Sequence, residues 1–375
     1  MQTKEVFGQT QAAIVWFTAQ GEKLAYQVKS ALSERMQQQV QIQMGRRPGQ
    51  SLKEWCREGF EQKQLLIFVG AVGIAVRSIA PFLKDKFTDP AVLALDEQGR
   101  YVIPVLSGHV GGGNRWAAVL AEELSAISVI TTATDLNGKF AVDVFASERN
   151  LTLTDRRMAK QISAEILAGE TIEFFCEKKA GGSLPAELIQ SESEEKEAEN
   201  VPGEPVGPEK SRIYVGIHRY PDRTNTLYLH PKALVVGIGC RKGKTMEEIE
   251  GFVHKTLQNH RLAMESVCCL ASLDLKKEEP GILEFAGKYQ IPFVTFSREE
   301  LAEAPGDYTE SGFVKEMTGI GNVCERAAVL AAENLSNVSS RPESEEKAGR
   351  LILKKTAECG MTIALAEKEW SVEFE

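Results

Sequence analysis

The sequence predicts a multi-domain α/β protein in which an N-terminal and a C-terminal parallel-sheet α/β domain are joined by a middle region. The chain has 375 residues, which is more than one ordinary hydrophobic core accommodates. Short β-rich runs are each followed by small residues or glycine and then by a segment of helical periodicity, a pattern typical of parallel α/β units. A polar segment punctuated by proline, residues 183–211, lies between the two halves.

The predicted strands alternate with helical segments along the chain. They are residues 12–18, 65–69, 128–132, 234–238, 267–270 and 291–296. We place the N-terminal domain at residues 1–135, the middle region at 136–232 and the C-terminal domain at 233–375. Residues 183–211 are expected to form a flexible acidic and proline-rich insertion in the middle region. A second polar run, residues 336–349, is predicted to be a loop between a helix and a strand.

The composition excludes several classes of protein. The net charge is -9 at pH 7, so general affinity for nucleic acid is not expected. The longest apolar stretch, residues 65–76, is too short to span a bilayer, and the apolar run 12–17 is too short for a signal-peptide core. Seven cysteines without framework spacing fit a reducing compartment. We therefore expect a cytoplasmic protein without disulfides that binds neither nucleic acid nor membrane.

Residues 107–114, SGHVGGGN, form the most distinctive stretch of the sequence. They lie between an apolar run and a helix-like segment, so their glycines are expected to leave backbone amides bare at a helix start, where an anion can approach. An imidazole near such amides can act as a general base while the amides stabilise a developing oxyanion. His109 is therefore a candidate for chemistry, for contact with a substrate carboxylate or for fixing the turn. Asn114 is a candidate helix cap or substrate contact.

A second glycine turn lies earlier in the chain. Gly70 and Gly73 connect a predicted strand to a predicted helix, and Arg77 follows in that helix. A guanidinium at this place can form a forked contact with a carboxylate, which favours a ligand site. Backbone packing alone could also require small residues there.

The third glycine motif is GIGCRKG, residues 237–243. It departs from the dinucleotide fingerprint because its last glycine comes one position late. Thr245 and Glu248 predict a capping box at an ordinary helix start. Cys240 lies beside two basic residues, a setting that can lower the pKa of a thiol and make it nucleophilic, although most cysteines are small buried hydrophobic residues.

Two acidic residues at the ends of predicted elements complete the candidates. Asp274 and Lys276 flank a leucine and alternate as at a strand end, which suits a polar site at the mouth of a parallel sheet. Glu325 follows a glycine turn at the start of an alanine-rich helix, where it could contact substrate or complement the helix dipole. No histidine or cysteine pair has zinc spacing, since His254 and His260 fall on different faces of a helix. We predict no metal site.

Several blocks of the sequence resemble the cobalt-precorrin 5A hydrolases of anaerobic cobalamin biosynthesis, the CbiG family. They are residues 88–114, 235–243, 271–281 and 318–328, and they follow one another in the family's order. The resemblance spans roughly residues 65 to 365 apart from a variable middle. Gly113 stands where alanine is usual in the family, and Arg326 stands where proline is common. Neither departure removes a chemical group.

The resemblance implies an enzyme and its substrate. In that family water opens the δ-lactone of cobalt-precorrin 5A and a two-carbon fragment leaves as acetaldehyde, which gives cobalt-precorrin 5B. No redox step and no cofactor are implied, because the cobalt is carried by the substrate. Corrinoid intermediates carry many carboxylates, so an acidic protein must gather positive charge locally to bind them. Neighbouring enzymes of the pathway are candidate partners, and the sequence leaves the oligomeric state open.

The motifs and the resemblance together give the candidate site residues. His109 is the predicted catalytic base, with Glu325 and Asp274 as further catalytic candidates. The predicted substrate contacts are Gly70, Arg77, Ser107, Gly108, Gly111, Gly112, Asn114, Gly239, Cys240, Arg241, Lys242, Ser272 and Lys276. Two alternatives stay open: a non-catalytic tetrapyrrole carrier of the same pathway, and an oxidoreductase that binds NAD(P).

Overall fold

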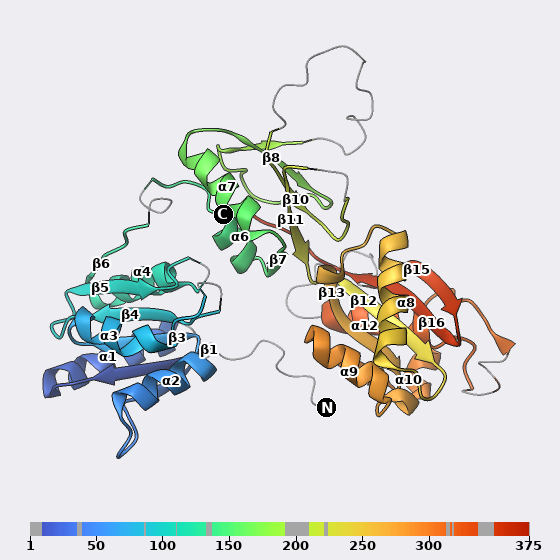
Figure 1. The fold of residues 1–375 in the computed structure, drawn as a ribbon, viewed down its shortest axis with the longest axis horizontal. Helices are drawn as coiled ribbons and strands as arrows, with labels where there is room; N and C mark the ends of the chain where they lie inside the picture. Colours follow the sequence, from blue (N-terminus) through green and yellow to red (C-terminus); the bar gives the residue numbers. More distant parts are fainter. Residues whose placement is uncertain are drawn as a thin grey trace, which may run out of the picture. The chain divides into compact units, whose positions relative to one another are not determined.

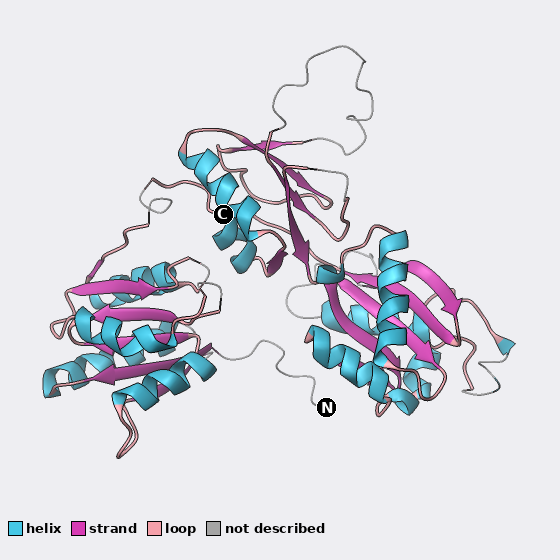
Figure 2. Cartoon of the chain, viewed as in Figure 1, coloured by secondary structure: helices cyan, strands magenta, loops and turns pink. Residues whose placement is uncertain are grey.

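The computed structural model describes residues 10–35, 40–85, 88–109, 111–132, 137–191, 210–220, 224–312, 316, 319–336 and 349–374. Contacts divide the chain into two units, Met1–Phe145 and Ala146–Glu375. Both units contain helices and strands (Figures 1 and 2). Within the described ranges, no helix reaches the length and apolarity needed to cross a membrane.

The first unit is built on a six-stranded sheet of order β2-β1-β3-β4-β5-β6. Its strands are β1 (Thr10–Trp16), β2 (Val40–Met44), β3 (Leu65–Val69), β4 (Ala91–Leu95), β5 (Tyr101–Leu106) and β6 (Ile127–Ser128). The first four strands are mutually parallel. β5 runs antiparallel to β4, and β6 runs parallel to β5.

Helices cover both faces of this sheet (Figure 1). They are α1 (Ala19–Arg35) and α4 (Gly113–Leu124) on one face, and α2 (Leu52–Gln62), α3 (Val72–Ile79) and η1 (Ala80–Phe82) on the other. Because successive strand side chains point to opposite faces, Ile14 and Ile67 join the first core while Val15 and Phe68 join the second. Burial on both faces explains why these strands are apolar without alternation.

The second unit contains two five-stranded sheets, and α6 (Val142–Glu148) spans the division between the units. The middle sheet has the order β7-β11-β10-β8-β9. Its elements are β7 (Leu151–Leu153), α7 (Arg156–Leu167), β8 (Ile172–Cys176), β9 (Leu188–Gln190), β10 (Arg212–Val215) and β11 (Thr226–Pro231). The predicted flexible insertion at 183–211 is wrong at its start, because β9 lies within it and pairs with β8. Residues 192–209 lie outside the described residues.

The C-terminal sheet has the order β14-β13-β12-β16-β15. Its strands are β12 (Leu234–Cys240), β13 (Val267–Leu273), β14 (Phe293–Phe296), β15 (Gly349–Glu358) and β16 (Met361–Lys368). β12, β13 and β14 are parallel, and β16 and β15 follow as antiparallel strands. The associated helices are α8 (Met246–Asn259), η3 (Met264–Ser266), η4 (Asp274–Lys276), α9 (Pro280–Tyr289), α10 (Arg298–Glu303) and α12 (Cys324–Ser336). These largely parallel sheets confirm the predicted α/β fold class.

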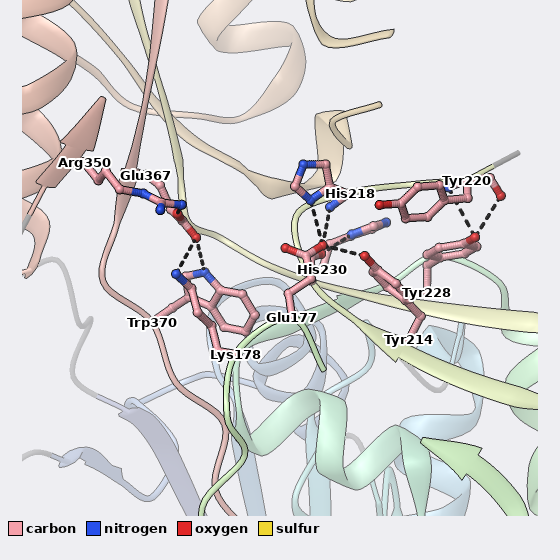
Figure 3. A network of polar contacts seen from close by, with 11 residues as sticks. Glu177, Lys178, Tyr214, His218, Tyr220, Tyr228, His230, Arg350, Glu367 and Trp370 are labelled. Atoms are coloured by element: carbon pink, nitrogen blue, oxygen red, sulfur yellow. Dashed lines mark hydrogen bonds and ion pairs between the residues drawn. The ribbon is translucent and has the colours of Figure 1, made fainter. Parts of the chain in front are cut away.

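Two polar clusters link segments of the second unit that are distant in sequence (Figure 3). Glu367 on β16 accepts a hydrogen bond from Trp370 Nε1 at 2.8 Å and forms ion pairs with Lys178 at 3.2 Å and Arg350 at 2.9 Å. Glu177 Oε1 accepts a hydrogen bond from Tyr214 Oη at 2.8 Å and lies 3.0 Å from His218 Nδ1. The Lys178–Glu367 ion pair joins the middle region to the C-terminal sheet, whereas the Glu177 contacts lie within the middle region.

The strand predictions succeed where a run is buried on both faces. The runs beginning near residues 12, 65, 234 and 267 are confirmed as β1, β3, β12 and β13. The run 291–296 is shorter than predicted, since β14 begins at Phe293, directly after a proline that cannot donate a ladder hydrogen bond. The prediction for 128–132 is wrong beyond Ser128, because the pairing of β6 with β5 stops there. The predicted loop at 336–349 falls between the end of α12 and the start of β15, but residues 337–348 lie outside the described residues.

Candidate functional site

A cavity of about 690 Å³ lies at the carboxyl ends of β12 and β13 in the second unit. The start of α12 and the turn between β15 and β16 supply its other walls. Its lining residues are 239–242, 272–273, 275–276, 311, 322–324, 355 and 357–362. The carboxyl edge of parallel strands is where α/β sheets commonly bind ligands.

Six of the substrate contacts predicted from the sequence line this cavity. They are Gly239, Cys240, Arg241, Lys242, Ser272 and Lys276. Ser272 Oγ donates a hydrogen bond to the carbonyl oxygen of Ile238 at 2.6 Å, so its hydroxyl holds neighbouring strands together. The sheet thus brings together residues that are more than thirty positions apart in the sequence.

The glycines of the GIGCRKG motif serve close packing in the sheet. Gly237 and Gly239 lie within β12 and not in a loop. A Cβ atom on Gly237 would lie 1.9 Å from the carbonyl oxygen of Cys324, so only glycine lets α12 begin this close to the strand. The predicted capping box at Thr245 and Glu248 is confirmed. The amides of Thr245 and Glu248 are therefore bonded to each other's side chains, as at an ordinary helix start.

Positive charge dominates the rim of the cavity. In the part of the chain that the structure describes, Arg241, Lys242 and Lys355 form no ion pair with a carboxylate, whereas Lys276 pairs with Glu279 at 2.9 Å. Burial opposes the ionisation of Glu279, but hydrogen bonds from Lys276 and from the Gly243 amide outweigh it and lower the pKa of this carboxyl group.

The lining also contains one carboxylate, which is neutralised, and an apolar floor. Glu358 pairs with Lys255 at 2.7 Å. Leu273, Leu275 and Met361 supply apolar surface. The uncompensated charges around this floor suit an apolar ligand that carries several carboxylates.

The prediction that basic neighbours lower the pKa of the Cys240 thiol is wrong. Burial raises its pKa, and the smaller effect of Lys276 does not compensate. Cys324, which also lines the cavity, has its pKa raised to about 11 by burial. These thiols are protonated near neutral pH, so they are weak nucleophiles.

Glu325 is fully buried and lies behind the cavity wall, outside the lining residues. Its Oε1 accepts a hydrogen bond from the Lys355 amide at 2.6 Å, and its Oε2 accepts one from the Thr309 amide at 2.8 Å. Burial opposes its ionisation, but these hydrogen bonds and one from the Asn322 side chain outweigh it and lower its pKa. Both oxygens are engaged by the backbone, so Glu325 does not fit the predicted catalytic role.

Asp274 is placed differently from the prediction. β13 ends at Leu273, and Asp274–Lys276 form the one-turn helix η4, so the expected strand-like alternation is absent. Lys276 reaches the cavity, while Asp274 is exposed outside its lining. The cavity therefore does not include Asp274, and its catalytic role stays a prediction.

The histidine loop belongs to the first unit. His109 Nδ1 lies 3.7 Å from Asp143 Oδ1, and the side chains are only 18% and 13% exposed. The carboxylate is thus close enough to orient the ring electrostatically, although the distance exceeds that of a hydrogen bond. His109 keeps the surroundings of a candidate base.

The prediction that the loop presents bare amides is wrong for three of them. The amides of Gly112, Gly113 and Asn114 donate to the carbonyl oxygens of His109, Ser107 and Gly108 at 2.8, 3.0 and 2.8 Å. Asn114 is not the helix cap either, because that position is taken by Gly112 with φ 76°. Asn114 instead donates from Nδ2 to Thr132 Oγ1 at 2.9 Å. The glycines here allow a tight loop that satisfies its own backbone.

The two glycine turns of the first unit lie at opposite ends of the strands of its sheet. Gly70 follows the carboxyl end of β3, and its amide donates to Leu95 at the end of β4 at 2.8 Å. The histidine loop follows β5, which is antiparallel to β4, and Ser107 Oγ donates to Asp89 O, before β4, at 3.0 Å. The sheet therefore separates Gly70 from the histidine loop, and Arg77 is an exposed residue of α3.

Family models for cobalamin synthesis protein G match most of the chain. The N-terminal model matches residues 54–135, the central-region model 140–231 and the C-terminus model 234–366. The chain is 33% identical over 322 residues to a cobalt-precorrin-5A hydrolase of Salmonella typhimurium, which covers 83% of this chain and 84% of that protein.

The chain belongs to the CbiG family.

The chain is also similar to a second curated relative and to a solved structure. The cobalt-precorrin-5A hydrolase of Priestia megaterium is 33% identical over 81% of this CbiG chain and 81% of its own length. The crystal structure of a cobalamin biosynthesis protein G homologue from Sulfolobus solfataricus has a TM-score of 0.40 and 21% identity, and the match covers 96% of this chain and 98% of that one.

Sequence reasoning missed the wall of the CbiG cavity formed by the β15–β16 turn. Lys355, Cys359 and Gly360 line the cavity, and none of them lies in a motif that the sequence alone sets apart. The nearest signal in the sequence is the lysine pair Lys354 and Lys355, which follows the apolar residues 351–353. Among the described residues, no group of three or more His, Cys, Asp or Glu side chains could hold a metal ion.

Proposed function

We propose that this chain is a cobalt-precorrin-5A hydrolase and that its corrinoid substrate binds in the cavity of the C-terminal sheet. The observation that carries the binding site is a set of three cations around an apolar floor, Arg241, Lys242 and Lys355, which have no ion-pair partner among the described residues. A corrinoid intermediate presents an apolar macrocycle with several peripheral carboxylates, which matches this arrangement. The activity is that of the curated relatives, which share 33% identity over more than four fifths of the chain.

The reaction consumes one water and releases acetaldehyde. Water adds to the lactone carbonyl, and the ring C–O bond breaks to leave a carboxylate and a hydroxyl group. Loss of the hydroxyl proton then expels the two-carbon fragment as acetaldehyde, while the electron pair of the broken C–C bond stays on the macrocycle and takes up a proton. Both steps need a base, and we assign that part to His109 with Asp143 as the group that orients it.

The protein needs no cofactor of its own in this proposal, since the cobalt belongs to the substrate. We also propose a cytoplasmic location, supported by seven cysteines without framework spacing. The three-part division at residues 1–135, 136–232 and 233–375 remains part of the proposal. It is supported by the positions of the matching family models.

The test is anaerobic incubation of the purified protein with cobalt-precorrin 5A, with acetaldehyde and substrate binding measured in parallel. The wild type is expected to release acetaldehyde, and His109→Gln is expected to lose release while it retains binding. His260→Gln is the matched control, because His260 is an exposed residue at the end of α8. Binding without release by the wild type would refute the hydrolase and favour a tetrapyrrole carrier.

A further inference from the structure

The edge strand of the C-terminal sheet is bulged where it borders the cavity. Leu353 pairs with Leu365 and Thr356 pairs with Ile363, so Lys354 and Lys355 together stand opposite the single residue Ala364. A bulge of this kind breaks the ladder and changes the direction of the side chains. Bulges are enriched on edge strands and beside binding sites for that reason.

A buried carboxylate fixes the bulge. The Lys355 amide donates to Glu325 Oε1 at 2.6 Å instead of to a strand carbonyl. Glu325 is 0% exposed, and its second oxygen accepts from the Thr309 amide at 2.8 Å. Asn322 Oδ1 in turn accepts from the Glu325 amide at 2.9 Å, which holds the start of α12 in the same place. Three segments thus meet at Glu325: the start of α12, the loop at Thr309 and the bulge of β15, to which Lys355 belongs.

The two lysines of the bulge have different surroundings. Lys355 lines the cavity, is half-buried and has no ion-pair partner in the described ranges. Lys354 lies outside the lining, with its side chain 64% exposed and its ammonium 3.7 Å from Asp307. Holding the Lys355 ammonium group beside the apolar floor without a counter-ion costs free energy, and a bound anion removes that cost. The ordinary alternative for a lysine is a solvated surface charge. Such a charge would not need its backbone held by a buried carboxylate.

We propose that Lys355 binds a carboxylate of the corrinoid substrate and that Glu325 is its positioning residue, acting through the bulge. This inference rests on the proposed function for the identity of the ligand. It does not rest on His109 or on the release of acetaldehyde, since it concerns only recognition. Glu325 touches no substrate atom in this arrangement.

The first experiment measures binding of a cobalt corrinoid that carries free carboxylates and of the same corrinoid as its methyl ester. Lys355→Met is expected to weaken binding of the free acid by about tenfold, because a hydrogen bond to a charged group is lost. Binding of the ester is expected to change by less than about twofold. Lys355→Arg should restore most of the affinity. Lys354→Met is the matched control and should bind both ligands as the wild type does.

The second experiment tests the positioning role with a double-mutant cycle. Glu325→Gln keeps a carbonyl oxygen but places an amide N–H against one of the two backbone donors. As a single substitution, Glu325→Gln should weaken binding of the free acid. Combined with Lys355→Met, it should cause no further loss of affinity. With substrate, both variants should raise KM and leave kcat nearly unchanged. Thermal unfolding confirms that each variant is folded, and Glu325→Asp, which shortens the reach to Lys355, replaces Glu325→Gln if that variant is not.

Three results would overturn the inference. One is equal binding of the free acid by Lys355→Met and the wild type. Another is an equal loss for acid and ester, which would indicate damage to the cavity and not the loss of a carboxylate contact. The third is an additive effect of the two substitutions, which would make Glu325 purely structural. Failure of the wild type to release acetaldehyde would count against the hydrolase alone, because the binding comparison stands independently of turnover.

Discussion

The histidine loop of the first unit and the cavity of the second unit both follow from glycine-rich motifs, yet their polar groups are used in opposite ways. In the loop, the amides of Gly112, Gly113 and Asn114 donate hydrogen bonds to the loop's own carbonyl groups. In the cavity, the charges of Arg241, Lys242 and Lys355 have no ion-pair partner within the described residues. A glycine motif therefore indicates close packing first, and a ligand site only where polar groups stay unpaired.

The largest expected effect concerns the chemistry assigned to the loop. His109→Gln should lower kcat by about 10²- to 10⁴-fold, because a general base is removed while the loop's internal hydrogen bonds are kept. Substrate affinity should stay within about twofold, since the proposed binding charges lie in the other unit. Single-turnover release of acetaldehyde measures the effect. An unchanged kcat would mean that the catalytic base does not lie in the loop, and the contrast between a catalytic loop and a binding cavity would no longer hold.

The next effect concerns packing beneath the cavity. Gly237→Ala should destabilise the protein by about 2–4 kcal/mol, because the new methyl group meets the carbonyl oxygen of Cys324 in the backbone. Gly251→Ala in α8 is the control: its Cβ would meet nothing within 4 Å, and alanine should stabilise the helix by about 0.5–1 kcal/mol. Urea unfolding measures both. Equal stability of the two variants would show that the strand tolerates displacement of α12.

The charge of the rim provides a third test. Lys242→Met should weaken corrinoid binding several-fold at low salt, and the loss should shrink as added salt screens the wild-type interaction. Lys244→Met is the control, because Lys244 lies outside the cavity lining and pairs with Glu248 at 2.6 Å. Titration at two ionic strengths distinguishes them. A loss of the same size for both variants would mean that general charge and not the rim attracts the ligand.

The buried carboxylate makes stability depend on pH in a definite direction. Burial alone would raise the pKa of Glu325, but the hydrogen bonds that it accepts outweigh burial and keep its pKa low in the folded protein. Its stabilising contribution is therefore present above the unfolded pKa of about 4.3 and is lost as the pH falls through the lower folded value. The slope of unfolding free energy against pH in this acid range should be smaller in Glu325→Gln. Identical slopes would mean that Glu325 titrates normally.

The smallest effect concerns the thiols of the cavity. With the pKa of Cys240 raised and that of Cys324 at about 11, iodoacetamide should label both slowly at pH 7 and faster as the pH rises. Cys359 is exposed and should be labelled first. Mass spectrometry follows each site, and Cys240→Ser should retain turnover. Rapid labelling of Cys240 at pH 7 would instead reveal a reactive thiol and reopen its catalytic role.

The sequence predicted the elements of both units better than their edges. β3 and β12 were predictable because strands buried on both faces have local apolar runs, whatever their neighbours are. The capping box of α8 was predictable because its residues lie three positions apart. The position of the histidine loop was not, since it depends on β5 pairing antiparallel to β4, and no local pattern records the direction of a neighbouring strand.

The sequence by itself determined the α/β class, the alternation of strands and helices, and the glycine motifs that mark the CbiG family, because all of these are written in residues close together along the chain. The tertiary structure alone decided which amides are consumed, that Glu325 is buried behind the cavity wall, and that a bulge brings Lys355 into the cavity. The physical reason is that hydrophobic periodicity is a local property, whereas hydrogen-bond satisfaction, desolvation and charge pairing depend on partners that only folding brings together.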